Sequence, residues 1–592
     1  MKTFLKYFFT GLGGYILGII TVIAIVGGLV SSLSGGLNFG SEAPKTPETG
    51  TILQLKITGG VTERVANNPI AELLGDQGMG ESVALGLNDI RNGLKKAATD
   101  PNIAGIFLDC GMYEGGLATA EEIRNALIAF RKTGKSVVAY SVAYSETGYF
   151  IASAADKVFA HPSGMIDLNG LSSRFVMYKG LLDKAGVGFQ VFRAGKYKSA
   201  VEPYIQTELS EPNKEQIRRY IQLLYNYQIE QIALSRKLNK DSLMATVLAG
   251  KIQMPVDAQQ LNLIDGLMYE DQALTQAYKA AKTAEKEEKL FSFAEYAKDV
   301  DPYSYSENKI AIIYGVGDIV PGKQDPFSSI GSVTFIKALK KARLDNSVKA
   351  IVIRINSPGG SALASDEIAR EIEICKKAKP VIASFGDVSA SGGYYLSCLA
   401  DSIVAQPNTI TGSIGVFALV ANTQDLFSNK LGLNYQTVDL GNMSAGWRPD
   451  RPLNEMESAF LQRSIDSIYD DFLSIVARGR KLSRAAVEEL AQGHVYTALD
   501  AKELGLVDVI GGIDRAILAA ARKAKIKEYR VVELPKNDDF LNKLFNPDKQ
   551  GEDQAKAIAQ KMGLNISQIK DLQRFMYLTG PQTYYPLSAD FR

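Results

Sequence analysis

Two long stretches of this chain are copies of each other, and a duplication of this size restricts the fold more than any other feature of the sequence. The stretch LKKAATDPNIAGIFLDC (94–110) aligns with LKKARLDNSVKAIVIRI (339–355), and EGGLATAEEIRNAL (114–127) aligns with PGGSALASDEIAREI (358–372). Further matches follow at a nearly constant offset through both halves. Because self-similarity over this length indicates a duplicated domain and not a short repeat array, we expect two copies of one fold.

Each copy alternates short β-branched runs with amphipathic stretches. In the second copy the runs KIAIIYG, AIVIRI and PVIASF have the length of strands, and SDEIAREIEICKKAK carries apolar residues at three- and four-residue steps. This alternation predicts parallel strands joined by crossover helices, which is an α/β fold class. The predicted segments are an N-terminal membrane anchor at 1–40, a linker at 41–50, an N-terminal repeat at 51–281, a connection at 282–308, a C-terminal repeat at 309–535 and a helical tail at 536–592.

The first forty residues are suited to a membrane. Lys2 and Lys6 precede a stretch without charge that continues to Glu42. Residues 8–30, about 23 in number, would form a helix of roughly 35 Å, which exceeds a hydrocarbon core of about 30 Å. The positive flank before the span predicts a cytoplasmic N-terminus and places the rest of the chain on the far side. A cleaved signal peptide is the alternative, but its A-x-A-like cleavage site is missing, so we favour an uncleaved transmembrane helix.

Composition argues against several classes of function. The net charge is +1 and the basic residues are scattered, which argues against a nucleic-acid partner. The chain has only two histidines, which argues against a histidine-based metal site. Its three cysteines lack CxxC spacing and are typical of buried free thiols. We therefore expect neither a metal nor a cofactor.

A serine in the second copy stands where a nucleophile could act. In GDVSASGGYY a predicted strand runs into Ser391, which two glycines and a predicted helix follow, whereas the first copy has Glu146 at this position. Such a turn is tight, and it points helix N–H groups at a developing anion. The segment INSPGGSA (355–362) brings two more glycines after a buried strand. Their N–H groups could approach a substrate carbonyl, as an oxyanion hole requires.

A serine nucleophile needs a base, and the sequence offers two kinds. His494 faces Lys251 in the first copy and His161 faces a glutamine in the second, and neither histidine has an evident carboxylate partner. Lysine is a known alternative to histidine in this role. Lys198, in GKYKSAVEP, faces Ser444 in the second copy. One half therefore holds the candidate serine and the other half the candidate lysine, with the histidines as the alternative bases.

The motifs GDVSASGGYY, NSPGGSA, TGSIGVF and GKYKSAVEP together resemble the signal peptide peptidase A family in its long duplicated (67K-type) form. These are S49-type Ser/Lys proteases whose domains resemble the Clp protease and crotonase superfamily. The resemblance implies that Ser391 is the nucleophile and Lys198 the general base. It further implies that Ser413 orients Lys198, and that the N–H groups of Gly360 and Gly392 form the oxyanion hole.

The resemblance also implies a biological setting. The first repeat would supply the base and the second repeat the nucleophile of one site. The enzyme would be a homotetramer in the bacterial inner membrane, with its catalytic domains on the periplasmic side and its N-terminal span in lipid. Its substrates would be remnant signal peptides and other short apolar peptides. A crotonase-like acyl-CoA enzyme and an inactive membrane scaffold are the alternatives.

Overall fold

A computed structural model describes residues 46–65, 85–286, 289–298 and 305–535, together with two short strands at 582–584 and 590–591. The chain from Thr49 onward forms one compact unit. The predicted membrane anchor and most of the predicted tail lie outside the described residues. Within the described ranges, no helix is both long and apolar enough to cross a membrane.

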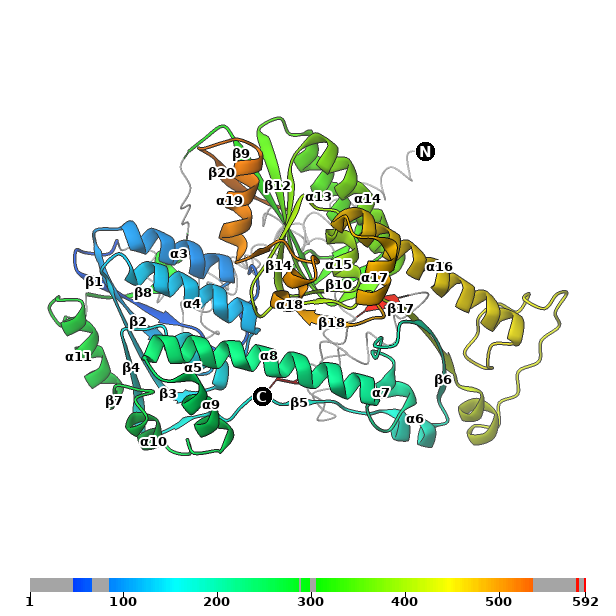
Figure 1. The fold of residues 1–592 in the computed structure, drawn as a ribbon, viewed down its shortest axis with the longest axis horizontal. Coiled ribbons are helices and arrows are strands. Elements are labelled where there is room, and N and C mark those ends of the chain that lie inside the picture. The colour runs from blue at the N-terminus through cyan, green and yellow to red at the C-terminus, as the bar shows by residue number, and fades with distance from the viewer. Residues whose placement is uncertain are drawn as a thin grey trace, which may run out of the picture. The chain divides into compact units, whose positions relative to one another are not determined.

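The N-terminal repeat is built on a six-stranded sheet in which every neighbouring pair is parallel, with the order β7-β4-β3-β2-β1-β8 (Figure 1). Helices cover both of its faces, because the strands are apolar on both sides. The strands are β1 (Thr51–Lys56), β2 (Ile103–Asp109), β3 (Ser136–Tyr144), β4 (Lys157–Ile166), β7 (Gly266–Leu267) and β8 (Leu290–Ser292).

Two groups of helices pack on this sheet. One face is covered by α3 (Leu87–Thr99), α4 (Leu117–Arg131) and α5 (Glu146–Ala152), and the opposite face by α11 (Glu270–Ala280). The long α8 (Glu211–Arg236) runs from this repeat toward the C-terminal repeat (Figure 1). The remaining helices of this half are α6 (Lys179–Ala185), α7 (Glu202–Ile205), α9 (Lys240–Leu248) and α10 (Pro255–Gln260).

The C-terminal repeat has the same plan. Its main path is β18-β16-β14-β12-β9-β20, with β15 and β19 branching from β14, and all its pairs are parallel except β16 with β18. These strands are β9 (Lys309–Val316), β12 (Val348–Ser357), β14 (Val381–Ala390), β15 (Ser402–Ala405), β16 (Ile410–Gly412), β18 (Val495–Thr497), β19 (Val509–Ile510) and β20 (Arg530–Leu534). The prediction of an α/β fold with parallel sheets in two copies is confirmed.

The helices of the C-terminal repeat also divide between the two faces of its sheet. Residues of α13 (Ser332–Leu344), α14 (Ala362–Ala378) and α15 (Gly392–Ser397) share a core with one face, and residues of α19 (Ile513–Lys523) cover the other. The remaining α-helices of this half are α16 (Glu455–Arg480), α17 (Arg484–Leu490) and α18 (Ala498–Glu503), and a π-helix spans Asp425–Lys430.

The segment predicted to connect the repeats contributes to the first of them. It contains β8, which pairs in parallel with β1, and α12 (Phe293–Ala297), whose Phe293 is fully buried in the core of that repeat. The C-terminal repeat ends in the same way, because β20 pairs in parallel with β9. In the two repeats, the chain segments after α11 and α19 therefore each add one more parallel strand to the sheet.

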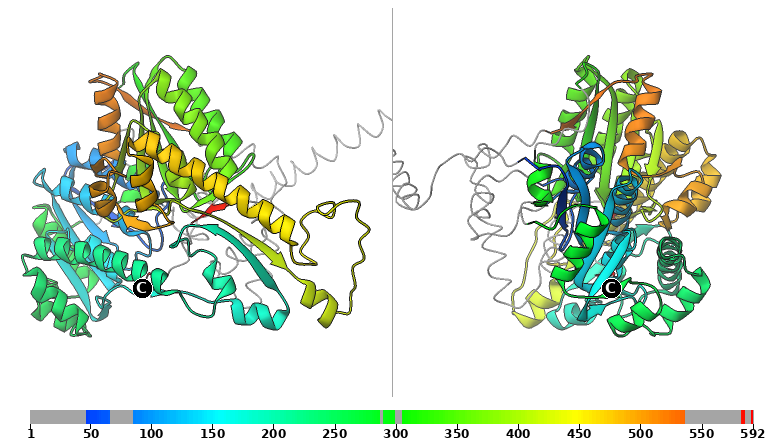
Figure 2. Two further views of the ribbon diagram at one scale, coloured as in Figure 1. Left: turned by 45° about the vertical axis from the view of Figure 1, so that its right-hand side comes forward. Right: turned by 90° about the vertical axis from the view of Figure 1, so that its left-hand side faces the viewer.

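A third sheet joins the two repeats. Its order is β11-β10-β13-β21-β17-β6, and it includes β10 (Asp318–Val320), β11 (Ser329–Gly331), β13 (Gly359–Ser361) and β21 (Gln582–Tyr584). Within it, β6 (Gly188–Ala194) of the N-terminal repeat pairs antiparallel with β17 (Val416–Asn422) of the C-terminal repeat along their whole lengths. Figure 2 shows this two-stranded ribbon with α16 beside it. Through this ribbon, strands of both repeats are hydrogen-bonded to each other in one sheet.

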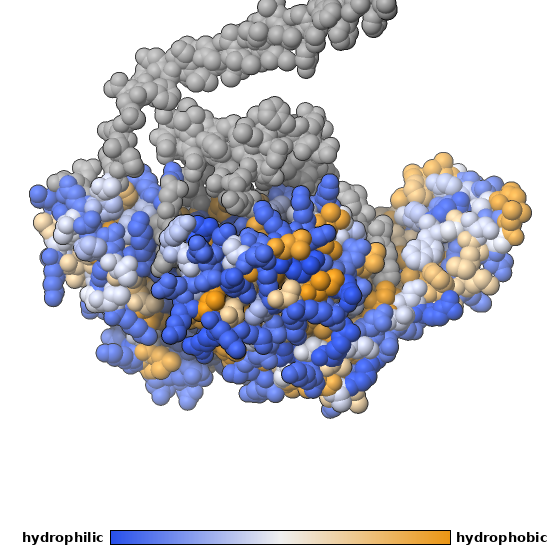
Figure 3. Space-filling view, turned by 90° about the horizontal axis from the view of Figure 1, so that it is seen from above, coloured by the Kyte–Doolittle hydropathy of each residue, from blue (hydrophilic) through white to orange (hydrophobic). Residues whose placement is uncertain are grey.

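The ribbon leads to a segment with many exposed apolar side chains. This segment follows β17 and ends before α16, and Figure 3 shows apolar side chains gathered at one end of the molecule. Its exposed large apolar residues are Leu431, Leu433, Tyr435, Val438, Leu440, Met443 and Trp447.

A buried ion cluster also fixes the docking of the repeats. Arg354 of β12 is fully buried, and its Nε lies 2.9 Å from Glu63 Oε1 while its Nη2 lies 2.8 Å from Glu122 Oε1. Both glutamates belong to the N-terminal repeat. Removing one partner of a buried ion pair costs about 3–5 kcal/mol, so the position of Arg354 is closely tied to that of the two glutamates.

Candidate active site

Ser391 occupies the turn between β14 and α15, and its backbone is strained. Its φ of 54° and ψ of −117° lie outside the regions that side-chain-bearing residues normally adopt. The turn is held by two hydrogen bonds, from Ser391 N–H to Gly412 O (2.8 Å) and from Tyr395 N–H to Ser391 O (2.8 Å). In this conformation the serine side chain does not cap α15. The strain therefore turns the hydroxyl away from its own helix.

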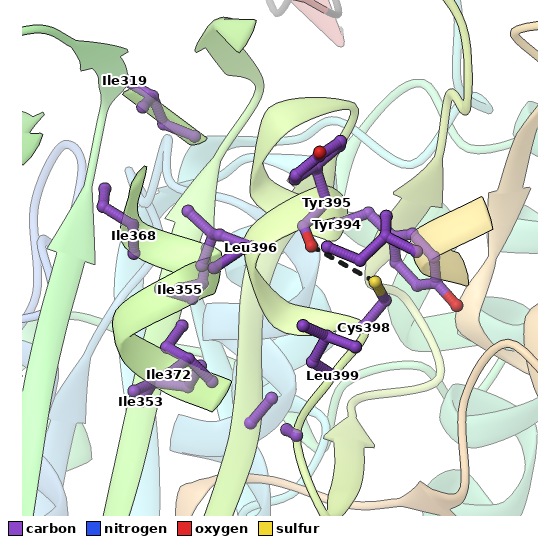
Figure 4. Packing of buried hydrophobic residues seen from close by; sticks show 14 of the residues in the cluster. Ile319, Ile353, Ile355, Ile368, Ile372, Tyr394, Tyr395, Leu396, Cys398 and Leu399 are labelled. Carbon is purple, nitrogen blue, oxygen red and sulfur yellow. Dashed lines mark hydrogen bonds between the residues drawn. The ribbon is translucent and has the colours of Figure 1, made fainter. Parts of the chain in front are cut away.

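The helix that follows Ser391 is anchored in the apolar core of the C-terminal repeat. Figure 4 shows Leu396 beside the isoleucines of β12 and α14, and Leu399 belongs to the same buried cluster. The Tyr394 hydroxyl donates to Leu506 O (2.9 Å), and the Tyr395 hydroxyl donates to Asp366 Oδ1 (2.8 Å). Because the helix is fixed at several points, the strained turn before it can persist.

Lys198 reaches Ser391 from the other repeat. It lies in a turn between β6 and α7, and its side chain is 1 % exposed. Its Nζ is 2.7 Å from Ser391 Oγ, 2.9 Å from Ser413 O and 3.0 Å from Ser413 Oγ. The structure thus brings together three of the residues that the sequence singled out, although they lie far apart in the chain.

A glycine of the C-terminal repeat makes room for the lysine turn. Tyr197 N–H donates to Gln492 O (2.7 Å), which holds the turn against the segment before β18. Gly493 has a φ of 76°, and a Cβ there would lie 2.6 Å from Lys198 N. No larger residue fits without moving the lysine. Sequence reasoning missed Gly493. The usable signal was that both copies have a glycine at this place, and Gly250 of the first copy also has a positive φ.

Burial controls the charge of the lysine. Removal from water lowers the pKa of Lys198 well below its usual value, and no carboxylate among the described residues compensates for the lost hydration. The nearest acidic residue in sequence, Glu202, is turned elsewhere and accepts hydrogen bonds from Ser210 N (3.1 Å) and Asn213 Nδ2 (2.9 Å). Its carboxylate is therefore bound to these two donors and not to Lys198.

Ser413 lies between β16 and β17 and completes the surroundings of the amine. Its φ is 52°, and its N–H donates to His494 O (2.7 Å). Through its carbonyl and its hydroxyl it offers two oxygens to Lys198 Nζ. Nζ of Lys198 therefore has three oxygen neighbours, one on Ser391 and two on Ser413.

The two predicted oxyanion glycines lie on neighbouring elements. Gly360 is in β13 with a φ of 149°, and a Cβ there would lie 2.2 Å from Ile319 O. Gly392 is the first residue of α15, directly after Ser391. A Cβ on the next residue, Gly393, would lie 3.0 Å from the carbonyl oxygen at the end of β12. The start of α15 therefore packs tightly against the segment that carries the glycine-rich loop.

An extended segment of the chain itself lies beside β13. In β21, Thr583 is opposite Gly360 and Gln582 is opposite both Ser361 and Phe417 of β17, with antiparallel pairing on both sides. Figure 1 shows this short red strand next to β17. The sequence had not predicted a strand here. The space between β13 and β17 therefore accommodates a peptide backbone in extended form.

Neither histidine is hydrogen-bonded to the candidate nucleophile in the described part of the chain. The His494 ring packs between Tyr197 (centroids 4.7 Å apart) and Tyr496 (4.5 Å), and burial lowers its pKa. His161 Nδ1 accepts a hydrogen bond from Ser163 N. Of the candidate bases, Lys198 is the one that contacts Ser391 Oγ.

Comparison with known proteins gives consistent results for both halves. The model of Peptidase family S49 matches residues 129–284 and again residues 373–527. Protease 4 of Haemophilus influenzae is 35% identical over 479 residues, which cover 78% of this chain and 76% of that protein. Protease 4 of Salmonella typhi is 35% identical over 508 residues (83% and 81%). The chloroplastic serine protease SPPA of Arabidopsis thaliana is 33% identical over 469 residues (77% and 69%).

Proposed function

The chain belongs to Peptidase family S49 and is a serine protease, and from this premise we propose that it cleaves peptides with a dyad of Ser391 and Lys198. The observation that carries the proposal is the 2.7 Å contact between Lys198 Nζ and Ser391 Oγ inside a buried site. A lysine can act as a base at neutral pH only when its pKa is well below about 10.4. Burial acts on Lys198 in that direction.

In the first half of the reaction the neutral Lys198 Nζ takes the proton of Ser391 Oγ as that oxygen attacks the peptide carbonyl carbon. The carbonyl oxygen becomes an oxyanion, which the N–H groups of Gly360 and Gly392 stabilise. Ser413 keeps the lone pair of Nζ directed at Oγ by accepting hydrogen bonds from the two N–H groups of the amine. Lys198 then returns the proton to the leaving nitrogen, and an acyl-enzyme and a free amine result.

The second half reverses these roles for water. A water molecule gives its proton to Lys198 Nζ and attacks the ester carbonyl of the acyl-enzyme. Collapse of the second oxyanion breaks the bond to Ser391 Oγ, which regains a proton from Lys198. The products are a carboxylate and the restored dyad, so one water is consumed for each peptide bond.

The strand between β13 and β17 supports a proposal about how substrates bind. We propose that substrates bind there as an extended strand, in the place of β21, because β13 carries Gly360 and leads from the end of β12 to α14. Short apolar peptides, such as remnants of signal peptides, suit this arrangement, since backbone pairing requires an unfolded segment. We further propose that the enzyme cuts within such peptides, as an endopeptidase.

The setting of the enzyme is part of the proposal. Residues 1–40 combine an uncharged apolar stretch with two preceding lysines, which supports an anchor in the bacterial inner membrane with the catalytic repeats on the periplasmic side. A homotetramer is proposed by resemblance. Carbonate washing of membranes that contain the full chain, or a chain starting at Ser41, tests the anchor. Sedimentation in detergent tests the tetramer.

The experiment that tests the activity uses the full chain in detergent. Wild type and Ser391→Ala are incubated with a synthetic signal peptide and with a polar peptide of equal length, and the products are identified by mass spectrometry. We expect wild type to cut the signal peptide internally and to cut the polar peptide more slowly, and Ser391→Ala to cut neither. Cleavage of the signal peptide by Ser391→Ala would reject the dyad.

A further inference from the structure

The strand that carries Ser391 bulges just before the serine. Along β12 and β14, Ile355 is opposite Phe385, but two residues later Ser357 is opposite Ser389, so β14 contains two extra residues. Bulges bend a strand and redirect the side chains after it. The extra residues are part of Gly386–Val388. Before this bulge β14 pairs with β15, and from Val388 onward it pairs with β16. The direction in which Ser391 points therefore depends on how this bulge is held.

Asp387 projects from the bulge to the other repeat. Its Oδ1 accepts a hydrogen bond from Thr119 N–H (2.9 Å), and its Oδ2 accepts one from the Thr119 hydroxyl (2.6 Å). Thr119 is the third residue of α4, which belongs to the N-terminal repeat. Asn356 braces the same bulge, because its Oδ1 accepts from Val388 N–H (3.1 Å) and its Nδ2 donates to Asp387 Oδ2 (3.4 Å).

The N-terminus of α4 lacks a cap of its own. Its N-cap residue is Gly116, which has no side chain to accept the first free N–H groups of the helix. Asp387 takes over this role from the other repeat, and its negative charge suits the positive end of the helix. A Cβ at position 116 would lie 2.1 Å from Asp387 Cγ. With an extended φ of −67°, Gly116 is needed for this space and not for its conformation.

We propose that Asp387 is a positioning residue for the reaction: by capping α4 of the N-terminal repeat, it fixes the bulge that aims Ser391 at Lys198. The proposal rests on the proposed function of the dyad. Lys198 is carried by the N-terminal repeat and Ser391 by the C-terminal repeat, so their 2.7 Å contact depends on how β14 sits against that other repeat. A misplacement of about 1 Å in such a contact lowers a rate by about 10²-fold.

The test measures the rate per working active site. In the full chain, a fluorophosphonate that reacts with nucleophilic serines counts the sites, and a peptide substrate gives kcat and KM. We expect Asp387→Ala to lower kcat per titrated site by about 10²-fold with little change in KM. Thr119→Val removes one of the two hydrogen bonds and should give a smaller loss, while Thr119→Ser keeps both and should retain most of the rate.

A matched control removes another carboxylate that crosses between the repeats. Asp500 of α18 pairs with Arg219 of α8 at 3.1 Å, and the side chain of Arg219 is 62 % exposed while that of Asp500 is 17 % exposed. Asp500→Asn should leave kcat per titrated site unchanged, because exposed ion pairs contribute about 0–1 kcal/mol. A general weakening of the contact between the repeats would instead affect both variants alike.

Two outcomes would overturn the proposal and one would overturn its premise. If Asp387→Ala has fewer titratable sites but a normal kcat for each, Asp387 is only structural. If Asp387→Ala fails to fold, Gly116→Ala and Thr119→Val decide the question, because each disturbs the same cap, and a normal kcat in both rejects the proposal. If the fluorophosphonate does not modify Ser391 in wild type, the dyad itself is wrong.

Discussion

The turns that end β3 and β14 hold equivalent places in the two repeats, yet they use their serines differently. Ser145 has an ordinary extended backbone (φ −70°, ψ 162°), and its Oγ accepts a hydrogen bond from Gly148 N to cap α5. Ser391 has a strained backbone (φ 54°, ψ −117°), caps nothing, and contacts Lys198 Nζ. In the relaxed turn the Ser145 hydroxyl caps a helix. In the strained turn the Ser391 hydroxyl contacts a lysine of the other repeat.

The residue that replaces the nucleophile in the N-terminal repeat also has a structural partner. Glu146 aligns with Ser391, and its Oε2 accepts hydrogen bonds from the N–H groups of Asn169 (2.9 Å) and Gly170 (3.1 Å). Burial raises its pKa to about 7. In the alignment these two residues correspond to those just after Ser413. At the place where Ser391 of the C-terminal repeat contacts Lys198, the N-terminal repeat thus has the Glu146 carboxylate bound to backbone N–H groups.

The largest effect is expected where the two turns are compared directly. Ser391→Ala should lower kcat by about 10⁵–10⁶-fold, because it removes the nucleophile. Ser145→Ala should keep kcat and lower the free energy of unfolding by about 1 kcal/mol, because it removes a helix cap. Peptide cleavage rates and urea unfolding of both variants check this. A large loss of kcat in Ser145→Ala would show that the repeats do not divide their roles in this way.

The next effect concerns Lys198, the proposed base, which the N-terminal repeat contributes to the site. Lys198→Arg should be as inactive as Lys198→Ala, with kcat lower by at least about 10⁴-fold. A guanidinium remains protonated and cannot take the serine proton. In wild type, kcat/KM should rise with pH as Lys198 loses its proton, with an apparent pKa below about 10.4. An active Lys198→Arg enzyme would require another base.

The same lysine predicts a pH-dependent stability. Because its folded pKa is lowered, the unfolded chain binds more protons between the folded pKa and about 10.4. The free energy of unfolding of wild type therefore rises with pH in that window through this group. Any advantage of Lys198→Met over wild type should be largest below the folded pKa and should shrink toward pH 10. A difference that stays constant from pH 6 to pH 10 would mean that the pKa of Lys198 is not lowered.

The amino-acid sequence alone predicted the type of sheet and the duplication of the domain. Alternating apolar runs predict the parallel sheets, and the duplication predicts that they occur twice. Aligning the copies shows that Lys198 and Ser391 each lack a like residue in the other half, and the resemblance to the family implies that the two form one site. The 2.7 Å contact agrees with that prediction, while the catalytic roles remain to be tested.

Other features depend on contacts that no pattern in the sequence reveals. The cap that Asp387 places on α4 joins residues 268 positions apart, and neither partner lies in a recognisable capping motif. The pairing of β6 with β17 is equally hidden, because a strand's partner depends on tertiary packing and not on its own periodicity. The strand β21 lies in a region where the sequence had predicted only a helical tail.

A smaller effect is expected from the C-terminal strands, which touch both repeats. β21 pairs with β13 and β17 of the C-terminal repeat, and β22 (Asp590–Phe591) pairs with β5 (Ser173–Arg174) of the N-terminal repeat. If substrates take the place of β21, deleting residues 582–592 should lower KM and leave kcat unchanged. The KM of the deletion divided by the KM of the full chain should equal the fraction of sites that the tail leaves open. We expect KM to fall on the order of 2–10-fold.

A chain that stops after residue 586 provides the control for this deletion. It keeps the residues of β21 and loses those of β22, so it separates pairing in the candidate peptide site from pairing with the N-terminal repeat. We expect its KM to lie between those of the full chain and the longer deletion. An equal KM in all three chains would place the substrate elsewhere.

The smallest effect is expected from His494→Ala, which asks whether the C-terminal repeat could supply its own base. The His494 ring packs between two tyrosines, and its carbonyl oxygen accepts the Ser413 N–H, a backbone contact that the substitution keeps. We therefore expect kcat to change by less than about tenfold, which is 1.36 kcal/mol in the barrier. Any loss should come from looser packing around Tyr197, beside Lys198. A folded His494→Ala enzyme without activity would make the C-terminal repeat self-sufficient and would end the division of roles on which the comparison rests.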